Sequence, residues 1–273
     1  MNRLFLWGLR MTIFDGNSTL AGLIDIVQGA GDIVKEASTK TKKITHKGRI
    51  DLVTETDIAV ENMLKLELAK LLPGSDFLAE ESAKDTKLGE FTWIIDPLDG
   101  TTNFAHGLPF VANSIGLWHK DRIVLGVVNL PLMNELFSAH EGHGAFMNGD
   151  PIEVSNAATM ESSLLATGFP YAIEDHLDTI LKHFKRLLPL TQGIRRPGAA
   201  ALDLAYVACG RYDGFFESAL NPWDTAAGLL LVQEAGGKVT QFDVANAYSF
   251  DSPTILATNG CIHDELSELL CED

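Results

Sequence analysis

Acidic residues recur in four short segments of this 273-residue chain, at places where the surrounding pattern predicts burial. Carboxylates are rarely buried unless they are paired or bound to a cation. These segments therefore need a counter-charge. They are DLVTETD at 51–57, AEES at 79–82, WIIDPLDGTTNF at 93–104 and NPWDTAAG at 221–228.

The third segment has the residues of a combined metal and phosphate site. An apolar strand at 93–95 delivers Asp96 at its end, and the following proline fixes the backbone so that Asp99 turns toward the same point. Gly100 lets a ligand approach the main chain, and threonines at 101–102 open a helix whose free amides suit a phosphate. The segment therefore predicts a phosphate bound beside a metal ion.

The fourth segment supplies a further carboxylate, Asp224, which we place at the N-cap of a helix that ends at 236–237. Oxygen ligands without Cys or His favour Mg²⁺ over zinc. A cluster of Asp224 with Glu80, Asp96 and Asp99 would repel itself without divalent ions, so we expect two or more Mg²⁺. Such a site can bind phosphate oxygens, activate water and stabilise a leaving alkoxide.

Other phosphatase and hydrolase patterns fit less well. Asp96 and Asp99 are three residues apart with a proline between them, which disfavours an aspartyl-phosphate enzyme of the D-x-D type. No G-x-S-x-G, Walker A or H-E-x-x-H segment occurs, and histidines such as His106 and His143 show no ligand spacing, so surface or hairpin positions are expected for them. Asp51 taken alone is equally consistent with a solvated carboxylate.

Hydrophobic periodicity and turn residues predict the elements that hold these segments. Helices are expected at 18–40, 56–72, 173–188, 199–209 and 224–235. Strands are expected at 76–79, 91–95, 114–119, 123–129, 135–140, 164–167, 213–217, 239–242 and 254–258, with a hairpin turn at 148–149. We predict an α/β protein: an α+β half at 1–150 with an antiparallel sheet and most metal ligands, packed on an α/β half at 151–273 that completes the metal and substrate site.

Composition limits the partners. The formal charge of −16 disfavours nucleic acid, and 46% hydrophobic residues with 21% charged indicate a globular chain. The three cysteines form no C-x-x-C pair, as expected for reduced thiols in the cytoplasm. The apolar run within residues 1–10 is too short for a signal peptide or a membrane helix, so we expect no membrane partner; it also fits an extension before a start at Met11.

In this order, the four segments resemble the inositol monophosphatase family of Mg²⁺-dependent, lithium-sensitive phosphatases. The resemblance covers about 51–237, and RRPGAAALDLAYVACGRYDGFFE at 195–217 is similar to the bacterial inositol-1-monophosphatase branch. It implies a layered αβαβα sandwich of the inositol monophosphatase or sugar phosphatase type, and a homodimer.

The resemblance also implies a ligand set. Glu80, Asp96 and the Leu98 carbonyl would hold one metal ion. Asp96, Asp99 and Asp224 would hold the second. Glu80 also reaches a third, weaker site, so two or three Mg²⁺ ions are expected, with Glu80 counted among the catalytic residues.

The same resemblance implies roles around the substrate. Asp57 and Thr101 match the pair that orients the attacking water, a general-base role. The Gly100 and Thr101 amides would hold the phosphate, and Glu217 would accept hydrogen bonds from hydroxyls of the alcohol. The substrate-binding set that it implies is Asp99, Gly100, Thr101, Gly198, Ala199, Ala200, Glu217 and Asp224.

Two residues depart from the family pattern. Ala79 stands where many members have Gly, and is tolerated if its φ is negative. Ala199 stands where many have Ser or Thr, which removes a hydroxyl from the substrate pocket. Lys47, within a basic stretch at 40–49, matches either a family lysine near the active-site flap or a solvated loop.

The function expected is a Mg²⁺-dependent phosphomonoesterase that hydrolyses an inositol monophosphate, or a related polyol phosphate, to the alcohol and phosphate. Water is the nucleophile and no phosphoenzyme forms. Three alternatives remain open: a phosphatase for NADP or 3′-phosphoadenosine 5′-phosphate, fructose-1,6-bisphosphatase activity, and a non-catalytic interaction protein with the same fold.

Overall fold

The computed structural model describes residues 14–40, 44–46, 52–83, 87–170 and 172–272. The start segment 1–10, most of the basic stretch 40–49 with Lys47, and Asp51 lie outside these residues. Within the described part, no helix has the length and apolar content needed to cross a membrane. The three cysteines are free.

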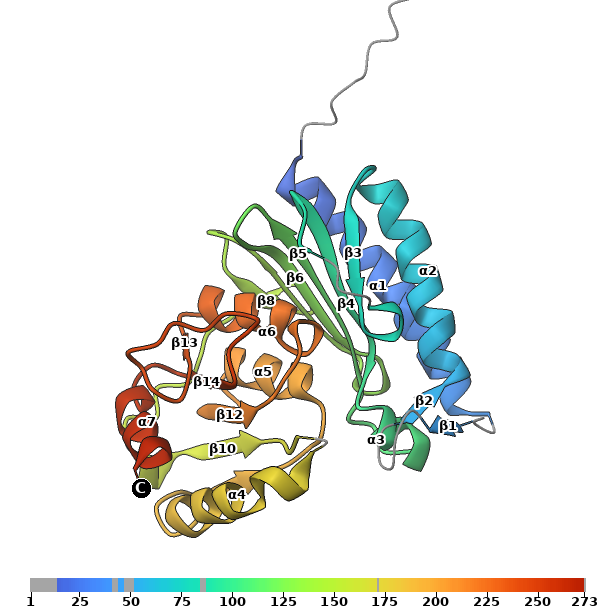
Figure 1. Cartoon of the computed structure of the whole chain (residues 1–273). Helices are drawn as coiled ribbons and strands as arrows, with labels where there is room; N and C mark the ends of the chain where they lie inside the picture. Colours follow the sequence, from blue (N-terminus) through green and yellow to red (C-terminus); the bar gives the residue numbers. More distant parts are fainter. Residues whose placement is uncertain (1–13, 41–43, 47–51, 84–86, 171, 273) are drawn as a thin grey trace, which may run out of the picture.

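Five layers follow one another through the molecule (Figure 1). Helices α1 (Gly16–Ser38) and α2 (Glu55–Leu71) cover one face of a seven-stranded sheet. Helices α5 (Ala200–Ala208) and α6 (Pro222–Glu234) lie between that sheet and a five-stranded sheet, and α4 (Ile173–Leu187) and α7 (His263–Cys271) pack on its far face. The αβαβα sandwich implied by the resemblance is thus confirmed.

Alternation along the strands produces these layers, because successive side chains point to opposite faces of a sheet. In the first sheet, Trp93 and Ile95 pack with the α1–α2 core, whereas Ile94 between them packs with α5 and α6. In the second sheet, Leu165 joins the α4–α7 core and Ala166 joins the α5–α6 core. Both sheets are buried on two faces.

The seven-stranded sheet has the order β3-β4-β5-β6-β7-β8-β9. Its strands are β3 (Asp76–Ala79), β4 (Phe91–Asp99), β5 (Ala112–His119), β6 (Arg122–Leu130), β7 (Glu135–His140), β8 (Ala145–Met147) and β9 (Asp150–Ile152). All neighbours are antiparallel except β3 and β4, which are parallel and so differ from the expected antiparallel sheet. Asn148 and Gly149, with φ of 52° and 89°, form the expected hairpin turn between β8 and β9.

The five-stranded sheet has the order β11-β10-β12-β14-β13. Its strands are β10 (Leu164–Thr167), β11 (Gly193–Arg195), β12 (Gly214–Ser218), β13 (Lys238–Thr240) and β14 (Thr254–Thr258). Strand β11 and helix α7 were not predicted. Two short strands, β1 (Ile44–His46) and β2 (Leu52–Thr54), a short helix, α3 (Thr101–His106), and three 3₁₀ helices at 80–82, 131–133 and 160–162 complete the described elements.

Small residues bring α6 close to the first sheet. A Cβ on Gly126 would lie 2.9 Å from the carbonyl oxygen of Ala227, and one on Gly116 would lie 3.0 Å from Cβ of Ala226. Such contacts leave no room for a larger side chain on either strand. The packing therefore fixes the start of α6, which carries Asp224, beside the ends of β4 and β5.

Candidate active site

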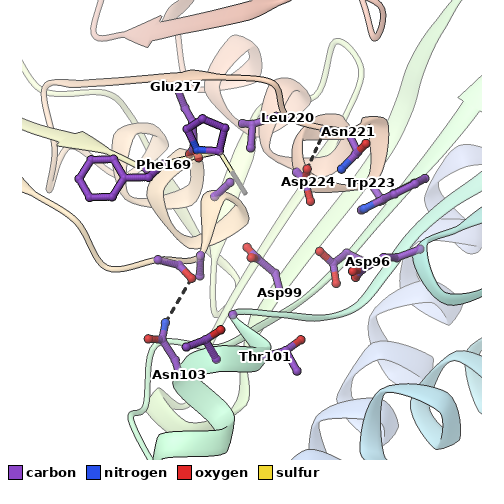
Figure 2. A pocket seen from close by; sticks show the side chains of 18 of the residues that line it. Asp96, Asp99, Thr101, Asn103, Phe169, Glu217, Leu220, Asn221, Trp223 and Asp224 are labelled. Carbon is purple, nitrogen blue, oxygen red and sulfur yellow. Dashed lines mark hydrogen bonds between the residues drawn. The ribbon is translucent and has the colours of Figure 1, made fainter. Parts of the chain in front are cut away.

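One cavity of about 290 Å³ lies where the two sheets and the central helices meet. Figure 2 shows that Asp96, Asp99 and Asp224 approach it from β4 and from the start of α6. All but one of the predicted site residues line it: Glu80, Asp96, Leu98, Asp99, Gly100, Thr101, Gly198, Ala199, Ala200, Glu217 and Asp224. The remaining residue, Asp57, reaches the cavity through Thr101.

Strand β4 does not end at Ile95 as expected but continues to Asp99, with a break in register between Asp96 and Asp99. Asp96 Oδ1 accepts a hydrogen bond from the Leu98 amide, 3.0 Å away. At Gly100 the backbone turns into α3 with φ of 86°, and a Cβ there would lie 2.6 Å from the Phe110 carbonyl oxygen. Only glycine fits this turn.

Asp57 and Thr101 form a buried pair behind the cavity. Asp57 is fully buried, and its Oδ2 accepts hydrogen bonds from the amide and hydroxyl of Thr54 in a capping box at the start of α2. The Thr101 hydroxyl lies 2.9 Å from Asp57 Oδ1 and 3.0 Å from the Leu98 carbonyl oxygen. Burial raises the pKa of Asp57, and the hydrogen bonds from Thr54 and Thr101 oppose that rise.

The carboxylates in the cavity raise one another's pKa. Burial comes first for Asp96, whose pKa lies well above its ordinary value, followed by the charges of Glu80, Asp99 and Asp224. Burial also raises the pKa of Asp99 to about 7, against a 2.7 Å hydrogen bond from the Ala201 amide. Burial and then the charge of Asp99 raise the pKa of Asp224 to about 7. The cluster therefore concentrates negative charge in the cavity.

Asp224 is not the N-cap of α6. Asn221 holds that position, Pro222 follows at the first helical position, and Asp224 is the third residue of the helix. Its Oδ2 accepts a 2.6 Å hydrogen bond from the Asn221 amide, which closes a capping box. From this position inside the first turn of α6 the Asp224 carboxylate still faces the cavity.

Glu217 on β12 forms the other side of the cavity. It is 8% exposed, and a Cβ on Gly168 would overlap its carboxylate. Burial raises the pKa of Glu217 to about 8; the Asp224 charge adds to the rise and Arg196 opposes it. Glycine at 168 therefore makes the room in which this carboxylate lies.

The two family departures have different consequences. Ala79 has φ of −131°, so its backbone needs no glycine, as expected. Ala199 is the N-cap of α5 and provides no side-chain cap. The substrate pocket therefore has the methyl group of Ala199 where many family members have a Ser or Thr hydroxyl.

As the side chains stand, no group of three or more His, Cys, Asp or Glu in the described part of the chain has metal-binding geometry. The donor set nevertheless fits divalent cations. The proposed ligands Glu80, Asp96, Leu98, Asp99 and Asp224 all line one cavity, and their carboxylates disfavour each other's ionised form. Oxygen donors without nitrogen or sulfur suit a hard cation, which would neutralise this negative charge.

Several lining residues were not expected from the sequence. They are Asn103, Gly168, Phe169, Pro170, Ile173, Arg196, Ala219, Leu220, Asn221 and Trp223. Most are apolar or small and carry no pattern that separates a pocket wall from a core. The Pro after Asn221 is a signal that a helix begins there, and it could have placed Asn221 at the site.

The five-layer fold and the acidic cavity beside the end of β4 define this chain as a layered α/β phosphatase. The model of the inositol monophosphatase family matches residues 16–273. The chain belongs to the inositol monophosphatase family, whose members are metal-dependent phosphatases, and is a phosphatase of that kind.

Relatives and solved structures agree with this membership. An inositol-1-monophosphatase of Synechocystis is 46% identical over 248 residues, which cover 90% of this chain and 86% of the relative. The Nus factor SuhB of Pseudomonas aeruginosa is 45% identical over 222 residues, 79% of this chain and 82% of that protein. The structure of inositol monophosphatase from Anabaena superposes with a TM-score of 0.84 at 41% identity, covering 93% and 95% of the two chains.

Proposed function

We propose that this phosphatase hydrolyses inositol monophosphates and related polyol phosphates with Mg²⁺ as its metal. One observation carries the proposal: Asp96, Asp99 and Asp224, from two distant segments, face a cavity that the Asp57–Thr101 pair also reaches. Relatives at 40–46% identity that bear inositol monophosphatase names support the substrate class.

The residues that would hold two Mg²⁺ ions are Glu80, Asp96, Leu98, Asp99 and Asp224, with a third ion near Glu80. When bound, the ions supply Lewis-acid stabilisation of the phosphoryl oxygens and of the leaving oxygen. Asp99 is already oriented for this role, because the Ala201 amide holds its Oδ2 at 2.7 Å.

The protein's own groups handle the proton. Thr101 donates its hydroxyl hydrogen to Asp57 Oδ1, which leaves the Thr101 oxygen lone pairs to accept a hydrogen bond from the attacking water. Asp57 is fixed in turn by Thr54. This chain of hydrogen bonds orients the water and provides a path for its proton to the buried carboxylate.

The alcohol part of the substrate would lie against Gly198, Ala199, Ala200 and Glu217, while Gly100 and Thr101 amides contact the phosphate. By the same resemblance we propose lithium sensitivity and a homodimer, and from the cysteine pattern we propose a cytoplasmic location. A solved inositol monophosphatase/NADP phosphatase is 22% identical with a TM-score of 0.85, so it shows the fold alone.

Phosphate release from inositol 1-phosphate, measured with Mg²⁺ and with EDTA, tests the proposal. We expect Mg²⁺-dependent turnover that Asp57→Asn reduces strongly. Absence of phosphate release from every monoester tried, in a folded protein with Mg²⁺, would support the interaction-protein alternative instead.

A further inference from the structure

Glu61 on α2 is a buried carboxylate outside the cavity lining. It is 4% exposed and lies one helical turn after Asp57, so both acidic side chains project from the same face of α2. Glu61 Oε1 lies 3.0 Å from Lys65 Nζ, and its Oε2 accepts a 2.9 Å hydrogen bond from the Glu81 amide. The Lys65 contact balances the buried charge, whereas the Glu81 contact joins α2 to a segment 20 residues further along the chain.

The segment that Glu61 contacts is the 3₁₀ helix Glu80–Ser82, which follows β3 directly. The N-cap residue of this short helix provides no side-chain hydrogen bond. The Glu61 carboxylate supplies the missing acceptor from α2, because it binds an amide of the first turn. Lys65 adds a second contact, from its ammonium group to the Ser82 hydroxyl. Helix α2 thus holds the two residues that follow Glu80.

Glu80 lies just beyond the paired part of the first sheet. Strands β3 and β4 are parallel, and their last paired residues are Ala79 and Ile95. The next residue of each strand is a proposed metal ligand, Glu80 or Asp96, so the two leave the sheet side by side. Because pairing stops at Ala79, the backbone that carries the Glu80 carboxylate depends on the 3₁₀ helix that Glu61 holds.

We propose that Glu61 is a positioning residue for the metal site, which fixes the turn that carries Glu80 and joins it to the helix that carries Asp57. This inference rests on the proposed ligand set, in which Glu80 binds Mg²⁺. Residues that orient metal ligands without touching the metal typically change its affinity by roughly 10- to 100-fold when they are replaced. An ion pair with Lys65 alone would not account for the bond from Glu61 to the Glu81 amide.

Two conservative variants separate the hydrogen bond from the charge. Glu61→Gln keeps the length of the side chain and an oxygen for the Glu81 amide, but removes the charge. Glu61→Asp keeps the charge and is one methylene shorter, which withdraws the oxygen from that amide. We expect calorimetric Mg²⁺ binding to weaken about tenfold in Glu61→Asp and less than about threefold in Glu61→Gln. The matched control is Glu67→Asp, which shortens a partly exposed α2 residue paired with Lys70 and should leave the affinity unchanged.

Urea unfolding in EDTA checks that each variant is folded before Mg²⁺ is added. A loss in Glu61→Gln equal to or greater than that in Glu61→Asp would mean that Glu61 acts through its charge, and would overturn the inference. Unchanged affinity in Glu61→Asp, or an equal loss in Glu67→Asp, would also overturn it.

Glu80→Gln tests the proposed ligand set separately. It should weaken Mg²⁺ binding, and Glu61→Asp should add little to that loss in the double variant, because both changes act on the same ligand. Unchanged binding in Glu80→Gln would contradict the ligand set on which the inference rests. Absence of phosphate release, with the expected difference between Glu61→Asp and Glu61→Gln in Mg²⁺ binding, would contradict the proposed substrate and leave the inference standing.

Discussion

Removing divalent cations should make the folded protein less stable as pH rises. In the absence of a metal, burial raises the pKa of Asp99 from 3.8 to about 7 and that of Glu217 from 4.5 to about 8. For each group, the folded state therefore binds more protons than the unfolded state at any pH between its ordinary pKa and its raised pKa. Below about pH 4 both groups are protonated in the folded and the unfolded state and cost no stability. The unfolding free energy then falls as pH rises toward 7 to 8.

The size of the effect follows from the pKa difference. For Asp99, about three pH units at 1.36 kcal/mol each give about 4 kcal/mol of lost unfolding free energy by pH 8. The losses of Asp99, Asp224 and Asp96 do not add, because their titrations are coupled. Mg²⁺ at 100 times its dissociation constant would restore about 3 kcal/mol, if the unfolded chain does not bind it.

Urea unfolding followed by circular dichroism, in EDTA and in Mg²⁺ at pH 5 to 8, measures both quantities. Asp99→Asn is the matched variant, since it removes one titrating group and keeps the shape of the side chain. We expect it to flatten the pH dependence in EDTA, and Mg²⁺ to stabilise the wild type more at pH 8 than at pH 5. An identical pH slope in Asp99→Asn and wild type, or equal Mg²⁺ stabilisation at both pH values, would refute the reasoning.

Three further predictions concern single side chains. Asp96→Asn should abolish phosphate release and most Mg²⁺ binding by calorimetry, and near-normal activity would count against the metal site. Thr101→Val should lower kcat by roughly 10²- to 10⁴-fold while Thr101→Ser keeps most of the activity, because the hydroxyl hydrogen-bonds to Asp57. Equal activity of the two variants would contradict a proton path through Thr101. Gly168→Ala should raise KM for a polyol phosphate with little change in kcat, since the added methyl displaces the Glu217 carboxylate; a variant with unchanged KM would show that Glu217 does not contact the alcohol.

The sequence predicted most elements and the convergence of the site, and its errors have physical reasons. Asp224 was placed at the N-cap because Asp favours that position, but Pro222 fixes the first helical residue and leaves Asn221 as the cap. Strand β4 was expected to stop before Pro97, which cannot donate to the sheet. It continues because Asp99 pairs with Ala112 of β5 after a break in register, and within that break the Pro97 carbonyl accepts a 2.6 Å hydrogen bond from the Asn113 side-chain amide.

Other features had no local signal. Strand β11 has three residues, too few for an alternating pattern, and pairs along β10 through tertiary contact. Nothing in the sequence distinguishes Arg196 from a solvated basic residue. Its place in the cavity depends on Phe169, 27 residues earlier in the chain, and on Asn103 in the other half of the molecule.

The acidic cluster is held together by packing and not by its own interactions. Its carboxylates raise one another's pKa, so their approach opposes folding at neutral pH. What brings Asp224 to the end of β4 is the close contact of α6 with Gly116 and Gly126, and of Gly228 with Leu204 on α5. The apolar core between the two sheets thus supplies the free energy that keeps the carboxylates close, and the repulsion that remains is what a divalent cation relieves on binding.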